Sequence, residues 1–124
     1  MAIAALTSGV HAHEHDPVAI REQIDESVLT CSSAIRLQNV GTSGFINSQN
    51  VKMNNMGSGQ QIVTTVKNAD SYDSLWTVKE SNRSGKMCKT GAPIKCGDIV
   101  RFEHNNTGKN LHSHSQYKAA LSNR

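Results

Sequence analysis

Histidines at alternate positions are the residues of this chain with the clearest capacity for chemistry. His11, His13 and His15 would project to one side of an extended segment, where such a cluster can hold a transition metal. We expect a solvated N-terminal arm instead, and no metal site is assigned. His112 and His114 repeat the spacing, and we expect them to sit on a strand. Their imidazoles could bond sugar hydroxyls or titrate near neutral pH, or simply satisfy neighbouring loop groups.

No set of side chains in the sequence resembles a catalytic centre. The acidic residues are scattered among predicted turns or lie on one face of a predicted helix, and no nucleophile with a base and an orienting group can be assembled. The glycine-rich run Gly57–Gln61 lacks the Lys-Ser/Thr of a phosphate-binding loop, and a strand rather than a helix is predicted after it. The chain is therefore expected not to be an enzyme and to need no cofactor.

Three cysteines, Cys31, Cys88 and Cys96, bear on the redox compartment. No Cys-x-x-Cys spacing occurs, which argues against a zinc ribbon or a dithiol redox motif. In a secreted domain the three would form one disulfide and leave one thiol, whereas a cytosolic chain would keep all three reduced.

Two sequons lie on predicted turns and make Asn82 and Asn105 candidate glycosylation sites. They read Asn82-Arg-Ser84 and Asn105-Asn-Thr107. Sequence rich in Asn, Ser and Thr also generates such triplets by chance, so occupancy is left open.

Length and charge limit the class of partner. The 124 residues allow one domain with a modest core, and the net charge of +3 comes from dispersed Lys and Arg, which argues against a nucleic-acid-binding face.

No stretch is long enough to span a membrane. Ala2–Leu6 is apolar and Val10-His-Ala12 would suit signal cleavage, but a basic region before them is missing. We interpret this as a signal-peptide remnant; the alternative is that Met1 is an internal methionine.

The remaining pattern predicts one short helix followed by β-structure. Asp16-Pro17 is a helix-start signal, and the apolar spacing after it predicts a helix over 17–28. Strands rich in Val, Ile and Thr are predicted at Ser33–Gln38, Gln60–Lys67, Ser74–Lys79 and Asp98–Glu103. Asn- and Gly-rich turns separate them, as is typical of an all-β barrel or sandwich.

Part of the sequence is repeated: residues 31–49 align with residues 96–114 without a gap. The identical pairs are Cys31/Cys96, Arg36/Arg101, Thr42/Thr107 and Ser48/Ser113. Two copies of one unit imply a fold in which neither copy buries its apolar face alone. Arg124 aligns with Gly59, in the middle of the first copy, so we expect a fragment of a larger repeat domain.

From Leu29 onwards the sequence resembles a MIR-motif β-trefoil, above all the stromal cell-derived factor two family. The residues that carry the resemblance are Leu29-Thr-Cys31, Ile35–Asn39, Gly57–Thr64, Leu75-Trp-Thr-Val78, Cys88–Cys96 and Thr107–His114. The resemblance implies an all-β trefoil of three repeats, of which about one and a half are present. The expected organisation is an N-terminal arm over 1–28 and a partial trefoil over 29–124, with repeats at about 31–90 and 94–124.

The resemblance also implies a function. Proteins of this family are non-catalytic, work in the endoplasmic reticulum beside an Hsp40-type co-chaperone and the Hsp70 system, and bind non-native or O-mannosylated clients. Related repeats occur within protein O-mannosyltransferases, so a glycan-recognising accessory domain is the alternative. Ile46–Gln49 stands where the family has Leu-His-Ser-His, so we do not assign the role of those histidines to the first repeat. A partial barrel has open strand edges, and we expect it to self-associate.

The repeat gives the cysteines their expected roles. Cys31 opens the first copy and Cys88 closes it, which predicts a Cys31–Cys88 disulfide and a free Cys96. A Cys88–Cys96 bridge is the alternative.

The resemblance to trefoils also implies that Gln60 ties its hairpin to the barrel. Trp76, the one tryptophan of the sequence, is expected to lie in the core; a sugar-stacking platform is the alternative. The candidate ligand-binding residues are Gln60, Asn110, His112 and His114.

Overall fold

The computed structural model describes residues 27–53 and 57–117. The histidines at 11, 13 and 15 and nearly all of the helix predicted over 17–28 lie outside these ranges; the last two residues of that helix, 27 and 28, form a turn and a bend. Among the described residues no helix is long and apolar enough to cross a bilayer.

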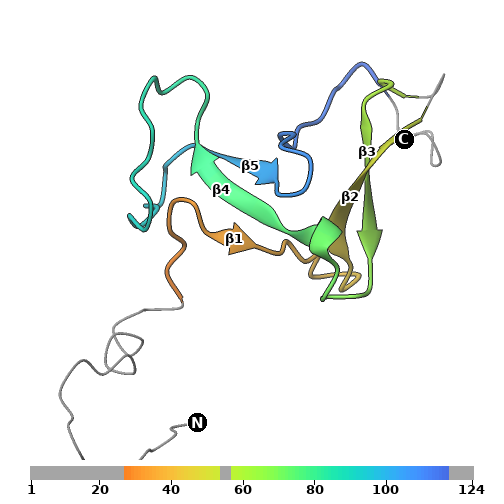
Figure 1. Ribbon diagram of the computed structural model, residues 1–124, viewed down its shortest axis with the longest axis horizontal. Helices are drawn as coiled ribbons and strands as arrows, with labels where there is room; N and C mark the ends of the chain where they lie inside the picture. Colours follow the sequence, from red (N-terminus) through yellow and green to blue (C-terminus); the bar gives the residue numbers. More distant parts are fainter. Residues whose placement is uncertain (1–26, 54–56, 118–124) are drawn as a thin grey trace, which may run out of the picture.

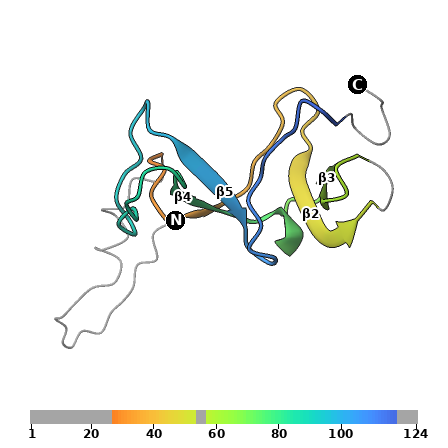
Figure 2. The ribbon, with the colours of Figure 1, turned by 90° about the horizontal axis from the view of Figure 1, so that it is seen from above.

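The described chain is all-β, as predicted, and forms two antiparallel sheets (Figure 1). One has the strand order β1-β4-β5 and consists of β1 (Ala34–Ile35), β4 (Trp76–Glu80) and β5 (Val100–His104). The other is a hairpin of β2 (Phe45–Lys52) and β3 (Gln61–Val66). A 3₁₀ turn, Tyr72–Ser74, precedes β4. From above, the segment after β5 runs between the sheet and the hairpin (Figure 2).

The predicted strands overlap four of the five, but β2 is missing from the prediction. Its sequence is largely polar, and its two buried side chains are those of Asn47 and Ser48. Asn47 donates to the hydroxyls of Ser71 and Ser74 at 3.2 and 3.1 Å, and Ser48 donates to the carbonyl of Ile62 at 2.8 Å. The buried side chains of β2 are polar and are satisfied by hydrogen bonds, so a search for apolar alternation cannot find this strand.

The sequence repeat is also a repeat of backbone hydrogen bonds, with a spacing of 65 residues. Matching pairs are Ile46 N to Leu37 O and Leu111 N to Phe102 O, both 2.9 Å, and Asn39 N to Gly44 O at 2.8 Å and His104 N to Lys109 O at 2.7 Å. Ser43 and Gly108 occupy the same left-handed turn position, with φ of 59° and 66°. The two copies therefore share one local fold as well as similar residues.

Two different side chains hold the same turn in the two copies. In the first, Asn39 Oδ1 accepts bonds at 2.9 Å from the N–H groups of Gly41 and Thr42. In the second, His104 stands at the equivalent position, and its Nδ1 lies 2.9 Å from the hydroxyl of Thr107, the counterpart of Thr42. His104 Nε2 also reaches the carbonyl of Asp73 at 3.0 Å. The histidine thus fixes its own turn and ties it to the loop before β4.

Trp76 lies at the centre of a small core, as its sequence context predicts. It is 1 % exposed, and Val78 and Cys31 are the other buried apolar residues among those described. Its ring is 4.9 Å from that of the fully buried His104, and its Nε1 donates to the carbonyl of Ile46 at 3.0 Å. One indole therefore connects the three-stranded sheet with the hairpin.

His112 and His114 lie outside the strands, contrary to the prediction that they sit on a strand of the second copy. Their first-copy counterparts, Asn47 and Gln49, belong to β2, which pairs with β3. Among the described residues no strand pairs with 112–114, so the two imidazoles have no ladder to join and His112 is exposed.

Candidate functional site

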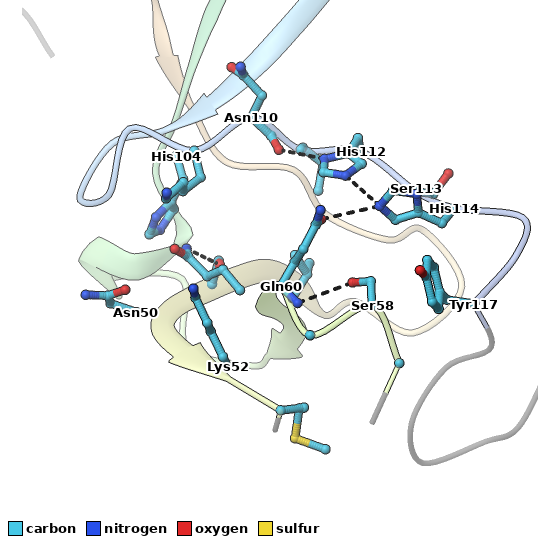
Figure 3. Close-up of a pocket in the computed structure, with 18 of the residues that line it drawn as sticks. Asn50, Lys52, Ser58, Gln60, His104, Asn110, His112, Ser113, His114 and Tyr117 are labelled. Atoms are coloured by element: carbon cyan, nitrogen blue, oxygen red, sulfur yellow. Dashed lines mark hydrogen bonds between the residues drawn. The ribbon is translucent and has the colours of Figure 1, made fainter. Parts of the chain in front are cut away.

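A cavity of about 870 Å³ opens between the turn before β3 and the segment after β5 (Figure 3). Trp76 and His104 line it from the core side. Its polar side chains are those of Ser48, Asn50, Lys52, Ser58, Gln60, Gln61, Lys109, Asn110, His112, Ser113, His114 and Tyr117. Among the described residues of its wall none is acidic. The wall thus offers amides, hydroxyls, imidazoles and cations to a polar or anionic ligand.

The structure brings together the four candidate ligand-binding residues predicted from the sequence. The Nε2 atoms of His112 and His114 are 2.9 Å apart, and Gln60 Oε1 lies 3.4 Å from His114 Nε2. His112 Nδ1 is 3.3 Å from the backbone carbonyl of Asn110. Tyr117 packs edge-on against the His114 ring, with centroids 5.4 Å apart. The cluster joins the turn before β3 to a segment about fifty residues further along the chain.

The hairpin is tied by Gln61, not by Gln60 as the sequence suggested. Gln61 Nε2 donates to Ser48 Oγ at 2.7 Å and to Thr107 Oγ1 at 2.9 Å, so it joins β2 to the turn after β5. Gln60 is exposed and faces His114 instead. Neighbouring residues at the start of a strand point to opposite faces, so one step in register exchanges their roles.

Gln61 also presents an orphan acceptor. Its Oε1 atom is buried and has no hydrogen-bond partner within the described part of the chain, although the residue lines the cavity. A buried carbonyl oxygen without a donor is uncommon in folded proteins. No sequence pattern indicates this acceptor, because burial of a single atom depends on the packing of both copies.

Ion pairs join β4 to β5, and one of their members, Arg101, reaches Asn110 in the cavity wall. Lys79 Nζ lies 2.7 Å from Glu103 Oε1, and Arg101 lies 3.2 Å from the other oxygen. Lys79, and after it Arg101, lower the pKa of Glu103. Arg101 Nη1 also donates to Asn110 Oδ1 at 2.8 Å. The Asn110 amide oxygen is therefore held by Arg101, while its backbone carbonyl holds His112.

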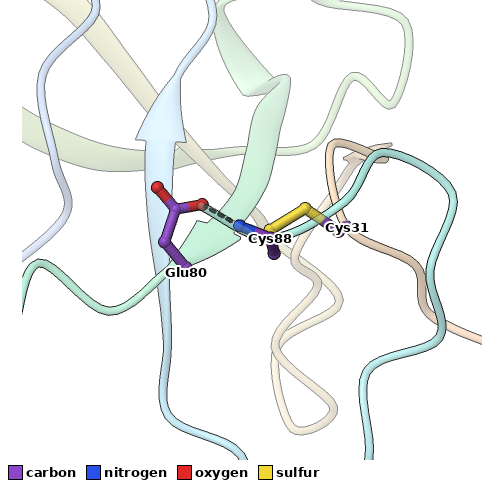
Figure 4. Close-up of side chains that lie close together, drawn as sticks. All are labelled: Cys31, Glu80 and Cys88. Atoms are coloured by element: carbon purple, nitrogen blue, oxygen red, sulfur yellow. Dashed lines mark hydrogen bonds between the residues drawn. A yellow bond between two sulfur atoms is a disulfide. The ribbon is translucent and has the colours of Figure 1, made fainter. Parts of the chain in front are cut away.

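A disulfide joins Cys31 and Cys88 across 57 residues of sequence, with the Cα atoms 6.0 Å apart (Figure 4). Glu80 Oε2 accepts the Cys88 N–H at 3.2 Å. The N–H groups of Glu80 itself and of Cys88 lower the pKa of this carboxyl group. The three residues are of metal-ligating types, but disulfide sulfurs offer no thiolate, so they form no metal site. Cys96 is an exposed free thiol.

Both sequon asparagines are exposed in turns. Asn105 Oδ1 accepts a hydrogen bond from the hydroxyl of Thr77, and the hydroxyl of Thr107 is held by His104 and Gln61. Asn82 lies in the loop after β4. Both remain candidate glycosylation sites.

The all-β fold and its internal repeat are those of a β-trefoil-type domain. The MIR domain family matches residues 65–124. Human stromal cell-derived factor 2 is 42% identical over 87 residues, covering 70% of this chain and 40% of that protein. The crystal structure of an SDF2-like protein from Arabidopsis thaliana superposes with a TM-score of 0.69 at 34% identity, covering 77% of this chain and 51% of the other.

The chain belongs to the stromal cell-derived factor 2 family of MIR-domain proteins. It spans about 40% of the length of the human relative. Protein O-mannosyl-transferase 2 of Danio rerio is also similar, at 37% identity over 90 residues, which cover 69% of this chain and 12% of that protein. A MIR domain is a binding module, and the chain is assigned as one rather than as an enzyme.

Proposed function

We propose that this chain is a non-catalytic binding module of the endoplasmic reticulum that acts in protein quality control. In this proposal it binds non-native or O-mannosylated clients and works beside an Hsp40-type co-chaperone and the Hsp70 system. Its membership of the stromal cell-derived factor 2 family supports the proposal. The Cys31–Cys88 disulfide suits an oxidising compartment, because such bonds are rare where thiols are kept reduced.

The cavity is the observation that carries the proposal. Its volume of about 870 Å³ lies within the range of small-ligand sites, roughly 300–1,000 Å³. A sugar offers several hydroxyl groups that donate and accept at once, which matches a wall of amides, imidazoles and ammonium groups. The orphan Gln61 Oε1 is an acceptor available for one such hydroxyl. Tyr117 adds an aromatic ring of the kind that packs against a sugar face.

Calorimetric titration with an O-mannosylated peptide and its unmodified twin tests the client chemistry. We expect the glycopeptide to bind and the bare peptide to bind at least about tenfold more weakly, as expected when a polar site loses its partners. Gln60→Ala and Lys109→Ala should weaken glycopeptide binding, because both residues line the cavity. Lys86→Ala, on an exposed loop elsewhere, is the matched control. Equal affinity for both peptides would exclude sugar recognition.

The proposed partnership with a chaperone system needs a separate experiment. A non-native client should aggregate more slowly with the chain, an Hsp40-type co-chaperone and Hsp70 together than with the chain alone or with the two chaperones alone. An equal amount of an unrelated disulfide-bonded β-protein controls for crowding. Identical aggregation curves with this chain and with the control would count against the partnership.

A glycan-recognising accessory domain of a protein O-mannosyltransferase is the second candidate. The similarity to the zebrafish transferase favours it. Multiple membrane spans in the full-length open reading frame would support this candidate, whereas a short open reading frame with a retention tail would support the first.

A further inference from the structure

Two imidazole nitrogens and an amide oxygen converge on one point of the cavity wall (Figure 3). The Nε2 atoms of His112 and His114 are 2.9 Å apart, and Gln60 Oε1 is 3.4 Å from the second. We propose that these three side chains bind a divalent transition-metal ion, Cu²⁺ or Ni²⁺ in preference to Zn²⁺. The site is additional to the client-binding function proposed above and does not depend on it.

The protonation of His112 is set by its neighbour. Its Nδ1 atom faces the backbone carbonyl of Asn110, which can only accept a hydrogen bond, so Nδ1 carries the proton and Nε2 carries the lone pair. Arg101 in turn holds the Asn110 side chain at 2.8 Å. A ring nitrogen that donates to a carbonyl while the other keeps its lone pair is the arrangement that orients metal-binding histidines.

The separation of the two Nε2 atoms favours right-angled coordination. Metal–imidazole bonds are about 2.0–2.1 Å long, so nitrogens 2.9 Å apart would subtend close to 90° at a shared ion. A tetrahedral ion would need them about 3.4 Å apart. Mixed nitrogen and oxygen donors at right angles suit Cu²⁺ and Ni²⁺. Water would complete the coordination beside Gln60 Oε1.

Charge around the cluster bears on affinity. Lys52 and Lys109 line the same cavity, and none of its described lining residues is acidic. A cation therefore binds with no carboxylate to neutralise it. Binding should be moderate, and an ion at this position would add to the attraction that the cavity exerts on anionic ligands.

Titration with CuCl₂ at neutral pH, followed by calorimetry and by electron paramagnetic resonance, tests the site. The background carries His11, His13 and His15 replaced by Ala, so that the N-terminal histidines do not compete. We expect one Cu²⁺ per chain with hyperfine structure from two nitrogens, and weaker binding of Zn²⁺. His112→Ala and His114→Ala should each weaken Cu²⁺ binding at least about tenfold.

His112 is exposed, and both histidines lie in a loop. The His112→Ala and His114→Ala variants should therefore have the melting temperature of the parent when no metal is present. An unchanged melting temperature separates loss of metal ligands from loss of folding. His112→Gln and His114→Gln provide a second, polar pair for the same comparison. Gln60→Ala should weaken binding less, because it removes a neutral oxygen. The proposal is overturned if Cu²⁺ does not bind, if His112→Ala and His114→Ala leave binding unchanged, or if the resonance shows one nitrogen.

Discussion

At the scale of single residues, two adjacent glutamines show how one step along the chain changes a role. Gln61 bonds to Ser48 and Thr107, whereas Gln60 is exposed beside His114. Gln61→Ala should lower the free energy of unfolding by about 1–2 kcal/mol, because two partly buried hydrogen bonds are lost. Gln60→Ala is the matched control and should change it by less than about 0.5 kcal/mol. Urea unfolding compares them, and equal losses would contradict the assignment.

His104 is the residue whose role the repeat explains best. It is fully buried and stands where the first copy has Asn39. His104→Ala should cost about 2–4 kcal/mol, because Trp76 loses a packed ring and the Asp73 carbonyl loses a partner. His104→Asn should cost less, since Asn holds the same turn in the first copy. Thermal melts rank the two, and an Asn variant as unstable as the Ala variant would show that the copies are not interchangeable here.

At the scale of elements, strands with apolar alternation could be predicted and a polar strand could not. Alternating Val, Ile and Thr located β3, β4 and β5 to within two residues or so. β2 was missed because its buried residues are polar and are satisfied from distant segments. The short β1 was overextended, because its pairing with β4 stops after Ile35.

The ion pairs of β4 and β5 predict how stability depends on pH. The pKa of Glu103 is lowered below its ordinary 4.5, first by the Lys79 hydrogen bond and then by Arg101. The unfolded chain therefore takes up protons first as pH falls, so this contribution is complete at neutral pH and is lost below about 4.5. Glu103→Gln should lower the free energy of unfolding at neutral pH by up to about 1 kcal/mol. The free energy of unfolding should then fall less steeply as the pH is lowered.

Urea midpoints measured from neutral pH down to pH 3 provide this comparison. Asp70→Asn, on an exposed turn, is the matched control for removing a carboxylate. A pH profile of Glu103→Gln that is parallel to that of the parent would refute the role of this pair.

At the scale of the whole molecule, the internal repeat is the feature of the fold that could be predicted best from the sequence. Positions spaced by 65 residues make matching backbone hydrogen bonds, although the residues at those positions differ between the copies. The convergence of Gln60 with His112 and His114 was harder to foresee in detail, because it depends on how the second copy packs against the hairpin of the first. Self-association through open strand edges stays a prediction.

The small core makes the disulfide important to the whole molecule. In the loop-entropy model, a bridge across 57 residues is worth about 4 kcal/mol. Cys31→Ser or Cys88→Ser should therefore lower the melting temperature strongly, whereas Cys96→Ser, at an exposed position, should be close to neutral. In the oxidised native protein one thiol, Cys96, should react with a thiol reagent. Three reactive thiols would contradict both the pairing and the oxidising compartment.

Binding in the cavity between the two copies can be followed by NMR of the backbone amides during titration with the O-mannosylated peptide. We expect concentration-dependent shifts at residues 57–61 and 109–114, which frame the cavity, and none there with the unmodified peptide. Shifts confined to the opposite loop at residues 81–88, or identical shifts with both peptides, would contradict this expectation.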